Sequence, residues 1–166
     1  EITLSPEDLA IGAGRRGDIA VSEQSFTGQG VIQPTLYADS GGVHMLLRST
    51  CGFVMRSDSF DEGESWSAPY RTELPNNNSG IDCELLEEGC LVVACNPIAG
   101  NWAERSVLSL YRSADGRAFE PLLTLEEEPG EEFSYPCVRR RGERLYVSYT
   151  FKRREIVVRE FVICRD

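Results

Sequence analysis

Strand-like segments recur along this chain at a nearly constant interval, and this recurrence restricts the fold more than any other feature. Short runs of alternating apolar and polar residues, separated by Gly, Asn, Asp and Pro, are typical of strands and turns, and no longer window favours a helical period. Similar cycles begin at residues 33–36 (QPTL), 79–82 (SGID) and 134–137 (SYPC), with offsets of 46 residues (33 to 79) and 55 residues (79 to 134). Because a four-stranded repeat of about 40–50 residues is the pattern of a β-propeller blade, the sequence predicts an all-β propeller.

The repeat divides the chain into about three blades. We expect these blades over residues 28–77, 78–129 and 130–166, after an N-terminal segment, 1–27, whose residues near 18–22 form the outer strand of a preceding blade. The strands expected within the three blades are 31–38, 43–50, 53–58, 70–74, 81–86, 90–96, 105–113, 135–140, 144–151 and 155–163.

Composition excludes several classes of partner. The chain has 166 residues, which is the size of one domain or of part of a larger one. Its net charge of −10 argues against nucleic acid, because neutralising phosphates requires clustered Lys and Arg. No segment of the sequence approaches the roughly 18 apolar residues that a membrane-spanning helix needs. We therefore expect no nucleic-acid partner and no membrane span.

The cysteines and the single histidine bear on disulfides and metals. Six cysteines, an even number, leave a disulfide framework open. Most of them lie in apolar strand-like runs, however, where a free thiol behaves as a small buried hydrophobe. The sequence has no CxxC pair, and one histidine, His44, is a poor start for a zinc site. We expect mainly free thiols, no metal and no cofactor.

One turn motif is present in two copies. The segment SFDEGESW, residues 59–66, has the form Ser-x-Asp-x-Gly-x-x-Trp and lies between two expected strands. A degenerate copy, SADGRAFEP (113–121), begins 54 residues later at the same point of the next blade, with Phe119 in the Trp position. Both resemble the Asp-box of sialidases and related propellers. The resemblance implies a turn brace on the rim opposite the active site, with a calcium or sugar site as the alternative.

The resemblance to sialidases extends over roughly residues 28–163. Matching segments occur in the order found in the second half of the sialidase-like catalytic propeller: GVIQPTLY, LLRST, LPNNNSGID, ERSVLSLYRS, EEFSYPCV and YTFKRREI. The chain is thus similar to the C-terminal half of a BNR/Asp-box sialidase domain, whose ring has six blades. About three blades leave such a ring open, which implies a missing N-terminal half or a homodimer of half-rings.

Sialidases cleave a terminal sugar whose reacting carbon carries a carboxylate, and this chemistry singles out particular residues. Arg holds a carboxylate best, because its planar guanidinium matches carboxylate geometry. A Tyr hydroxyl replaces the usual carboxylate nucleophile, which would repel the substrate. The resemblance implies that Arg48 and Arg105 bind the substrate carboxylate and that Tyr135 is the catalytic nucleophile. In the alternative interpretation, the two arginines are solvated strand-end charges and Tyr135 is a core aromatic.

Gln33 stands where family members commonly supply the Glu that activates the tyrosine. Because Gln cannot usefully accept a proton, either another carboxylate serves or hydrolysis is lost. Glu131, Glu132 and Glu155 are candidates for a supporting carboxylate, and Glu155 also resembles a family carboxylate that orients an arginine. Gln33 and Asn78 are assigned to substrate binding, with a turn-forming role for Asn78 as the alternative.

The resemblance implies a sialidase-like glycoside hydrolase, or its C-terminal half, that acts on terminal sialic-acid-type sugars. Two alternatives stay open. The first is a catalytically inactive propeller that binds glycans or proteins, which Gln33 favours. The second is a structural module in which the boxes only brace the blades. The expected partner is a carbohydrate.

Overall fold

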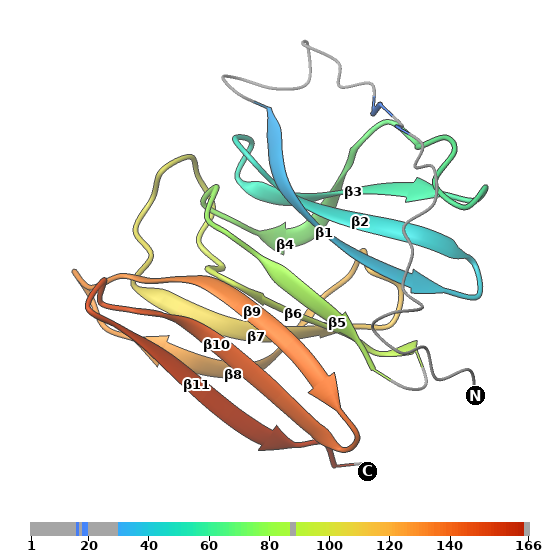
Figure 1. Cartoon of the computed structure of the whole chain (residues 1–166). Coiled ribbons are helices and arrows are strands. Elements are labelled where there is room, and N and C mark those ends of the chain that lie inside the picture. Colours follow the sequence, from blue (N-terminus) through green and yellow to red (C-terminus); the bar gives the residue numbers. More distant parts are fainter. Residues whose placement is uncertain (1–15, 17, 20–29, 87–88, 165–166) are drawn as a thin grey trace, which may run out of the picture.

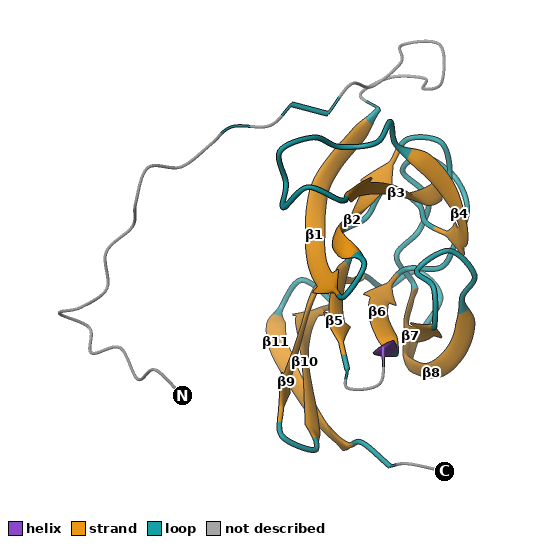
Figure 2. Cartoon of the chain, turned by 90° about the vertical axis from the view of Figure 1, so that its right-hand side faces the viewer, coloured by secondary structure: helices purple, strands orange, loops and turns teal. Residues whose placement is uncertain are grey.

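The described part of the chain folds into eleven β-strands in three antiparallel sheets (Figure 1). The structure is a computed structural model that describes residues 16, 18, 19, 30–86 and 89–164. Strands and loops account for nearly all of the ribbon in Figure 2, and the expected all-β fold is confirmed. No helix in these residues is long and apolar enough to cross a membrane. The strands are β1 (Val31–Asp39), β2 (Gly42–Ser49), β3 (Phe53–Ser59), β4 (Tyr70–Pro75), β5 (Asp82–Leu85), β6 (Leu91–Cys95), β7 (Val107–Ser113), β8 (Glu120–Glu127), β9 (Phe133–Arg141), β10 (Arg144–Phe151) and β11 (Glu155–Val162).

Each sheet is an antiparallel meander in which the strands follow one another in chain order. Strands β1–β4 and β5–β8 form four-stranded sheets, and β9–β11 form a three-stranded sheet within the described range. The three sheets do not close into a ring, which confirms the prediction of a partial propeller. Strand β8 is not among the strands expected from the sequence, because two adjacent leucines, Leu122 and Leu123, interrupt its alternation. The segment 1–27, with its strand near 18–22, lies almost entirely outside the described residues.

The innermost strands β1, β5 and β9 lie side by side, and Figure 1 places β5 between the other two. Thr35 of β1 and Val138 of β9 both bond to Asp82 of β5. Gln33 and Tyr135 lie nearer the N-terminal ends of β1 and β9, and both approach Gly80, just before β5. The three strands therefore run in the same direction. Their N-terminal ends form one rim of the molecule, which we call the strand-start rim.

The middle sheet contributes to two cores at once. Strand β6 is buried on both faces, which explains why its five residues, LVVAC, are apolar without alternation. The core between the first and second sheets contains Tyr37, Leu46, Val54, Leu74, Ile81, Cys83, Leu91, Val93 and Cys95. The core between the second and third sheets contains Val92, Ala94, Leu108, Leu110, Leu125, Phe133, Val138, Leu145, Val147 and Tyr149. All six cysteines are free, and burial raises the pKa of the Cys83 and Cys95 thiols to about 12.

The first Asp-box forms the turn between β3 and β4, on the rim opposite the strand starts, which we call the Asp-box rim. Ser59 Oγ donates to Asp61 Oδ1 (2.8 Å) and accepts from Gly63 N (2.8 Å). Ser65 N also donates to Asp61 Oδ1 (2.8 Å). Gly63 has a φ of 87°, a conformation that a Cβ resists. The Ser and Asp side chains are thus bonded within the turn, as a brace requires.

The second Asp-box, between β7 and β8, also contacts the first sheet. Within the turn, Ser113 Oγ accepts a hydrogen bond from Gly116 N (2.8 Å). Arg56 of β3 donates to the carbonyl oxygen of Asp115. Gly116 has a φ of 67° and lies so close to Tyr37 Oη and to the Arg56 guanidinium that a Cβ has no room. This turn therefore connects two neighbouring blades as well as two strands.

Candidate functional site

Two equivalent irregularities mark the strand-start rim. Gln33 in β1 and Tyr135 in β9 each lie at a register shift in the strand pairing, and each precedes a proline. Their φ angles are 48° and 54°. A left-handed conformation is uncommon for residues other than glycine, and strained backbone of this kind clusters at functional sites. The two bulges aim two side chains at the same point of the rim.

Gly80 is the point at which these side chains meet. A Cβ on Gly80 would lie 3.4 Å from Tyr135 Cδ1 and 3.5 Å from both Gln33 Nε2 and Gln33 Oε1. Gln33 and Tyr135 therefore both reach the backbone at Gly80, just before β5, at distances that would be ordinary contacts even for an alanine there. The Tyr135 side chain is 51% exposed, so it is not a core aromatic.

Arg105 lies beside Tyr135. It precedes β7 on the strand-start rim, and its Cζ atom is 5.4 Å from the centroid of the Tyr135 ring. Its side chain is only 13% exposed, and its Nη1 bonds to Glu132 Oε1 at 3.0 Å. This carboxylate engages one edge of the guanidinium, and the remaining nitrogens have no hydrogen-bond acceptor in the described part of the chain.

Arg48 is a partly buried cation without an acidic partner among the described residues. It lies near the end of β2, and its Nη1 donates to the carbonyl oxygen of Asn78 at 3.2 Å. Its Nε is buried and has no acceptor in the described residues. Burial lowers the pKa of Arg48, and repulsion from Arg105 adds to this effect, while the Tyr135 phenol opposes it. An anion that binds here would relieve both the desolvation and the repulsion.

Glu132 holds the cationic side of the site in place. Its Oε1 accepts from Arg105 and from Ser134 Oγ (2.9 Å), and its Oε2 accepts from Arg153 Nε (2.7 Å). Burial by itself raises the pKa of Glu132, but the bonds from Arg153 and Ser134 and the charge of Arg105 hold it below the usual value. Glu132 is therefore a stable anion that orients arginines, and it is a poor acceptor for a proton.

Asn78 connects the site to the loop between β6 and β7. It is fully buried with a φ of 61°, and its Nδ2 donates to Asn101 Oδ1 (3.0 Å). The next loop residue, Trp102, donates its backbone N–H to Asn77 O (3.2 Å) and leaves its side chain 66% exposed. Asn78 Oδ1 and Ser79 Oγ are buried without a hydrogen-bond partner in the described residues. Arg48 thus bonds to a segment that carries buried, unpartnered polar atoms and that also bonds to the backbone of Trp102.

Two other expected carboxylates do not contact the tyrosine. Glu131 lies 3.7 Å from Lys152 Nζ. Glu155 is exposed at the start of β11, and none of the described ion pairs or side-chain hydrogen bonds involves its carboxylate, so its assigned role stays a prediction. No described hydrogen bond reaches the Tyr135 hydroxyl, and the Gln33 amide and the Tyr135 ring both lie beside Gly80.

Sequence reasoning missed Asp82, which joins the three innermost strands. Asp82 Oδ1 accepts from Thr35 Oγ1 of β1 (2.7 Å). Asp82 Oδ2 accepts from Val138 N (2.8 Å) and Arg139 Nη1 (2.9 Å) of β9. Innermost strands of neighbouring blades belong to different sheets, so a side chain supplies the connection that backbone pairing does not. The sequence carried a signal, since an acidic residue in the apolar run IDCELL needs a buried partner.

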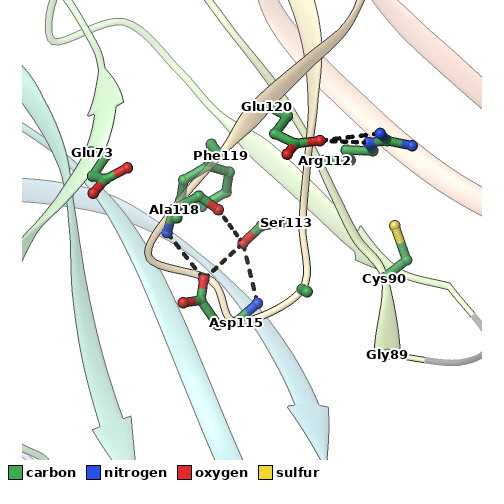
Figure 3. Close-up of a pocket in the computed structure, with 10 residues that line it drawn as sticks. Glu73, Gly89, Cys90, Arg112, Ser113, Asp115, Ala118, Phe119 and Glu120 are labelled. Atoms are coloured by element: carbon green, nitrogen blue, oxygen red, sulfur yellow. Dashed lines mark hydrogen bonds and ion pairs between the residues drawn. The ribbon is translucent and has the colours of Figure 1, made fainter.

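The hollow beside the second Asp-box is not a comparable site. It has a volume of about 770 Å³. Figure 3 shows that the polar groups of the turn bond to one another and that Arg112 pairs with Glu120, while Glu73 and Cys90 make no bond to the other residues drawn. Ser113 and Asp115 bond within the turn, and Arg112 Nη2 pairs with Glu120 Oε2 at 3.0 Å. Among the described residues, no group of three or more His, Cys, Asp or Glu side chains is arranged to hold a metal ion.

The antiparallel blades, the two Asp-box turns and the arginine–tyrosine arrangement on the opposite rim define a partial sialidase-like propeller. The family model described as BNR repeat-like domain matches residues 12–147, and the chain belongs to this family. No curated protein matches the sequence.

Solved structures share the fold. An α-L-arabinofuranosidase from Fusarium graminearum has a TM-score of 0.65 and 16% identity, over 87% of this chain and 49% of that one. An N-acetylgalactosamine deacetylase from F. plautii has a TM-score of 0.55 and 20% identity, over 72% and 40%. Trypanosoma rangeli sialidase has a TM-score of 0.55 and 16% identity, over 74% and 21%. The chain thus spans about half or less of each of these proteins.

Proposed function

We propose that this chain supplies part of a sialidase-like glycoside hydrolase site for a terminal sialic-acid-type sugar. In this proposal the sugar carboxylate lies between Arg48 and Arg105, and Tyr135 faces the anomeric carbon. The observation that carries the proposal is Arg48, a partly buried cation that lacks an acidic partner in the described residues and lies within electrostatic range of Arg105 and Tyr135. The sugar-acting enzymes named among the similar structures support it.

Neighbouring groups suit the uncharged parts of such a ligand. Asn78 Oδ1 and Ser79 Oγ lack partners in the described residues but are fully buried, so sugar hydroxyls would donate to them only if the segment 76–79 opens. Trp102 offers an exposed indole face, and an apolar sugar face packs well on an aromatic ring. We therefore assign Gln33 and Asn78 to ligand contact, with Trp102 as a stacking surface beside them.

Hydrolysis through Tyr135 needs two proton transfers in addition to the nucleophile. The phenolic oxygen would attack the anomeric carbon as the bond to the leaving oxygen breaks. The phenolic proton must pass to a base, and the leaving oxygen must receive a proton from an acid. No described carboxylate contacts the Tyr135 hydroxyl, and Glu132 is held by Arg105 and Arg153. Turnover therefore requires an acid and a base outside this set of contacts.

Binding without turnover is the second candidate function. Gln33 favours it, because an amide beside the tyrosine donates and accepts hydrogen bonds without taking a proton. The arginines, the asparagine and the indole serve a glycan-binding propeller equally well.

One set of variants distinguishes these functions. Turnover of a fluorogenic sialoside and binding of free sialic acid by calorimetry are measured for the chain, for Tyr135→Phe and for Arg105→Ala. Hydrolysis predicts turnover that Tyr135→Phe abolishes while binding persists, and both functions predict that Arg105→Ala weakens binding. The control is Arg112→Ala, which removes an exposed arginine paired with Glu120 far from the site. Absence of both binding and turnover would refute both functions and favour a structural module.

Ring closure is a further part of the proposal. The outer strand β11 exposes Ile156, Val158 and Val162, which are 62–67% accessible. These three side chains lie on one face of the sheet, with Glu160 between the last two, and apolar side chains on a sheet face are suited to packing against another blade. We propose that a second half-ring, either an N-terminal half or another copy of the chain, covers this face. A stable, well-folded monomer in light scattering would exclude the homodimer.

A further inference from the structure

The turn between β10 and β11 has an unusual backbone for its residue types. Arg154 N donates to Phe151 O at 3.0 Å, which closes a β-turn within the three-residue loop 152–154. Its central residues, Lys152 and Arg153, have φ angles of 51° and 53°. Hairpin turns with two left-handed residues normally contain Asn and Gly, because other side chains are strained there. Two long basic residues occupy the turn instead.

Acidic residues of the preceding segment hold this strained turn in place. Lys152 Nζ pairs with Glu128 Oε2 (2.6 Å) and lies 3.7 Å from Glu131 Oε1. Lys152 N also donates to Glu132 O (2.7 Å). Arg153 Nε pairs with Glu132 Oε2 (2.7 Å). The turn is therefore fixed to the segment that leads directly into Tyr135, and strain that is retained in this way points to function.

The charges around Tyr135 do not balance. Lys152 is neutralised by Glu128 and Glu131, but Glu132 is shared between Arg105 and Arg153. Arg48 has no acidic partner in the described residues. Counted together, these four cations face three carboxylates, which leaves one positive charge in excess, on a chain whose net charge is −10. Such a local excess attracts anions to this rim.

The guanidinium of Arg153 is exposed and oriented so that it can bind an anionic ligand. Its side chain is 68% exposed, and its charge interacts with the Tyr135 phenol. Only its Nε is engaged, by Glu132, so its two terminal nitrogens have no acceptor in the part of the chain that is described. Because the turn and Glu132 already orient the side chain, little rotamer freedom is lost when an anion binds.

We propose that Arg153 determines specificity by binding a second anionic group, so that the ligand is an acidic oligosaccharide with carboxylates on adjacent sugars. This inference rests on the proposed function, in which Arg48 and Arg105 hold the first carboxylate. Arg153, on the exposed edge of the same cluster, then receives the carboxylate of the neighbouring sugar.

The test compares sialic acid, with one carboxylate, and α2,8-linked disialic acid, with two, by calorimetry at low salt. We expect the full chain to bind the disaccharide about tenfold more tightly, as one added charged contact provides. In Arg153→Gln this ratio falls to near one, while affinity for sialic acid changes less than about twofold. Arg153→Lys, which keeps the charge and loses the fork, retains an intermediate ratio. Arg154→Gln is the matched control from the same turn and keeps the full ratio.

Two outcomes overturn the inference and are distinguishable. Equal affinity for the two sugars, or a ratio that persists in Arg153→Gln, refutes the role of Arg153, while binding that depends on Arg105 keeps the proposed function intact. Failure of the unmodified chain to bind either sugar overturns the proposed function and this inference together.

Discussion

Replacing Asp82 with alanine tests how the blades are held together at their inner edge. One carboxylate accepts from Thr35 of β1 and from Val138 N and Arg139 of β9, at 2.7, 2.8 and 2.9 Å. The Asp82 side chain is 15% exposed, whereas that of Arg139 is 64% exposed. The change to alanine therefore removes two shielded hydrogen bonds and one solvated ion pair.

The expected loss follows from these exposures. A hydrogen bond to a charged group contributes about 1.5–3 kcal/mol, so the two shielded bonds account for roughly 3–6 kcal/mol. The exposed pair with Arg139 adds at most about 1 kcal/mol. Removing the carboxylate also removes its own desolvation cost, which places the net loss near the lower end, at about 3 kcal/mol. With a urea m-value of about 2 kcal/mol/M, the unfolding midpoint falls by roughly 1.5 M.

The assay is urea unfolding followed by circular dichroism at pH 7. Asp82→Asn, which keeps one acceptor oxygen, is expected to lie between wild type and Asp82→Ala. Arg139→Gln removes only the exposed pair and should cost less than about 1 kcal/mol. The connecting role of Asp82 is refuted if Asp82→Ala costs no more than Arg139→Gln.

Two further predictions concern the contact between the first two blades. Gly116→Ala places a Cβ against Tyr37 and Arg56 and should lower the free energy of unfolding by about 3 kcal/mol, measured in urea. The control is Gly142→Ala, at a φ of 58° with open space around it, which should cost only about 1 kcal/mol. Equal losses in the two variants would exclude the clash. Burial by itself raises the pKa of Asp58, but hydrogen bonds from Tyr70, His44 and Arg56 outweigh burial and leave the pKa below its usual value. The contribution of Asp58 to folding stability is therefore complete above the unfolded pKa of about 3.9 and is lost as the pH falls through the lower folded value. Stability measured between pH 2 and 6 should therefore depend less on pH in Asp58→Asn, and an unchanged profile would contradict this assignment.

The blade pattern was predictable because it depends on local alternation. Strand β10 matches its expected range, 144–151, and β11 ends one residue before its expected end. The Asp-box at 59–66 identified the turn between the third and fourth strands of a blade, because its Ser–Asp–Gly spacing depends only on hydrogen bonds within that turn. Strand β8 escaped prediction because it is largely exposed and its leucines follow no alternation.

Much of the candidate site could not be predicted from local patterns. Arg48, Arg105 and Tyr135 were assigned by resemblance, and the structure brings them together. The left-handed backbone at Tyr135 depends on a register shift between β9 and β10, which neither strand specifies alone. The orientation of Arg153 could not be predicted, because it depends both on its own turn and on the ion pair with Glu132, 21 residues earlier in the chain.

The two rims of the molecule differ in how completely their polar groups are satisfied. On the Asp-box rim, Ser113 and Asp115 bond to one another and to the turn backbone. Among the described residues, every buried side-chain nitrogen or oxygen that lacks a partner lies on or near the strand-start rim: Arg48 Nε, Thr50 Oγ1, Asn76 Oδ1, Asn77 Oδ1, Asn78 Oδ1, Ser79 Oγ and Asn96 Oδ1. Folded proteins leave few such groups unpaired, because each costs about 1–3 kcal/mol. Their concentration beside the excess positive charge therefore favours the strand-start rim as the place where a hydroxylated, anionic ligand binds.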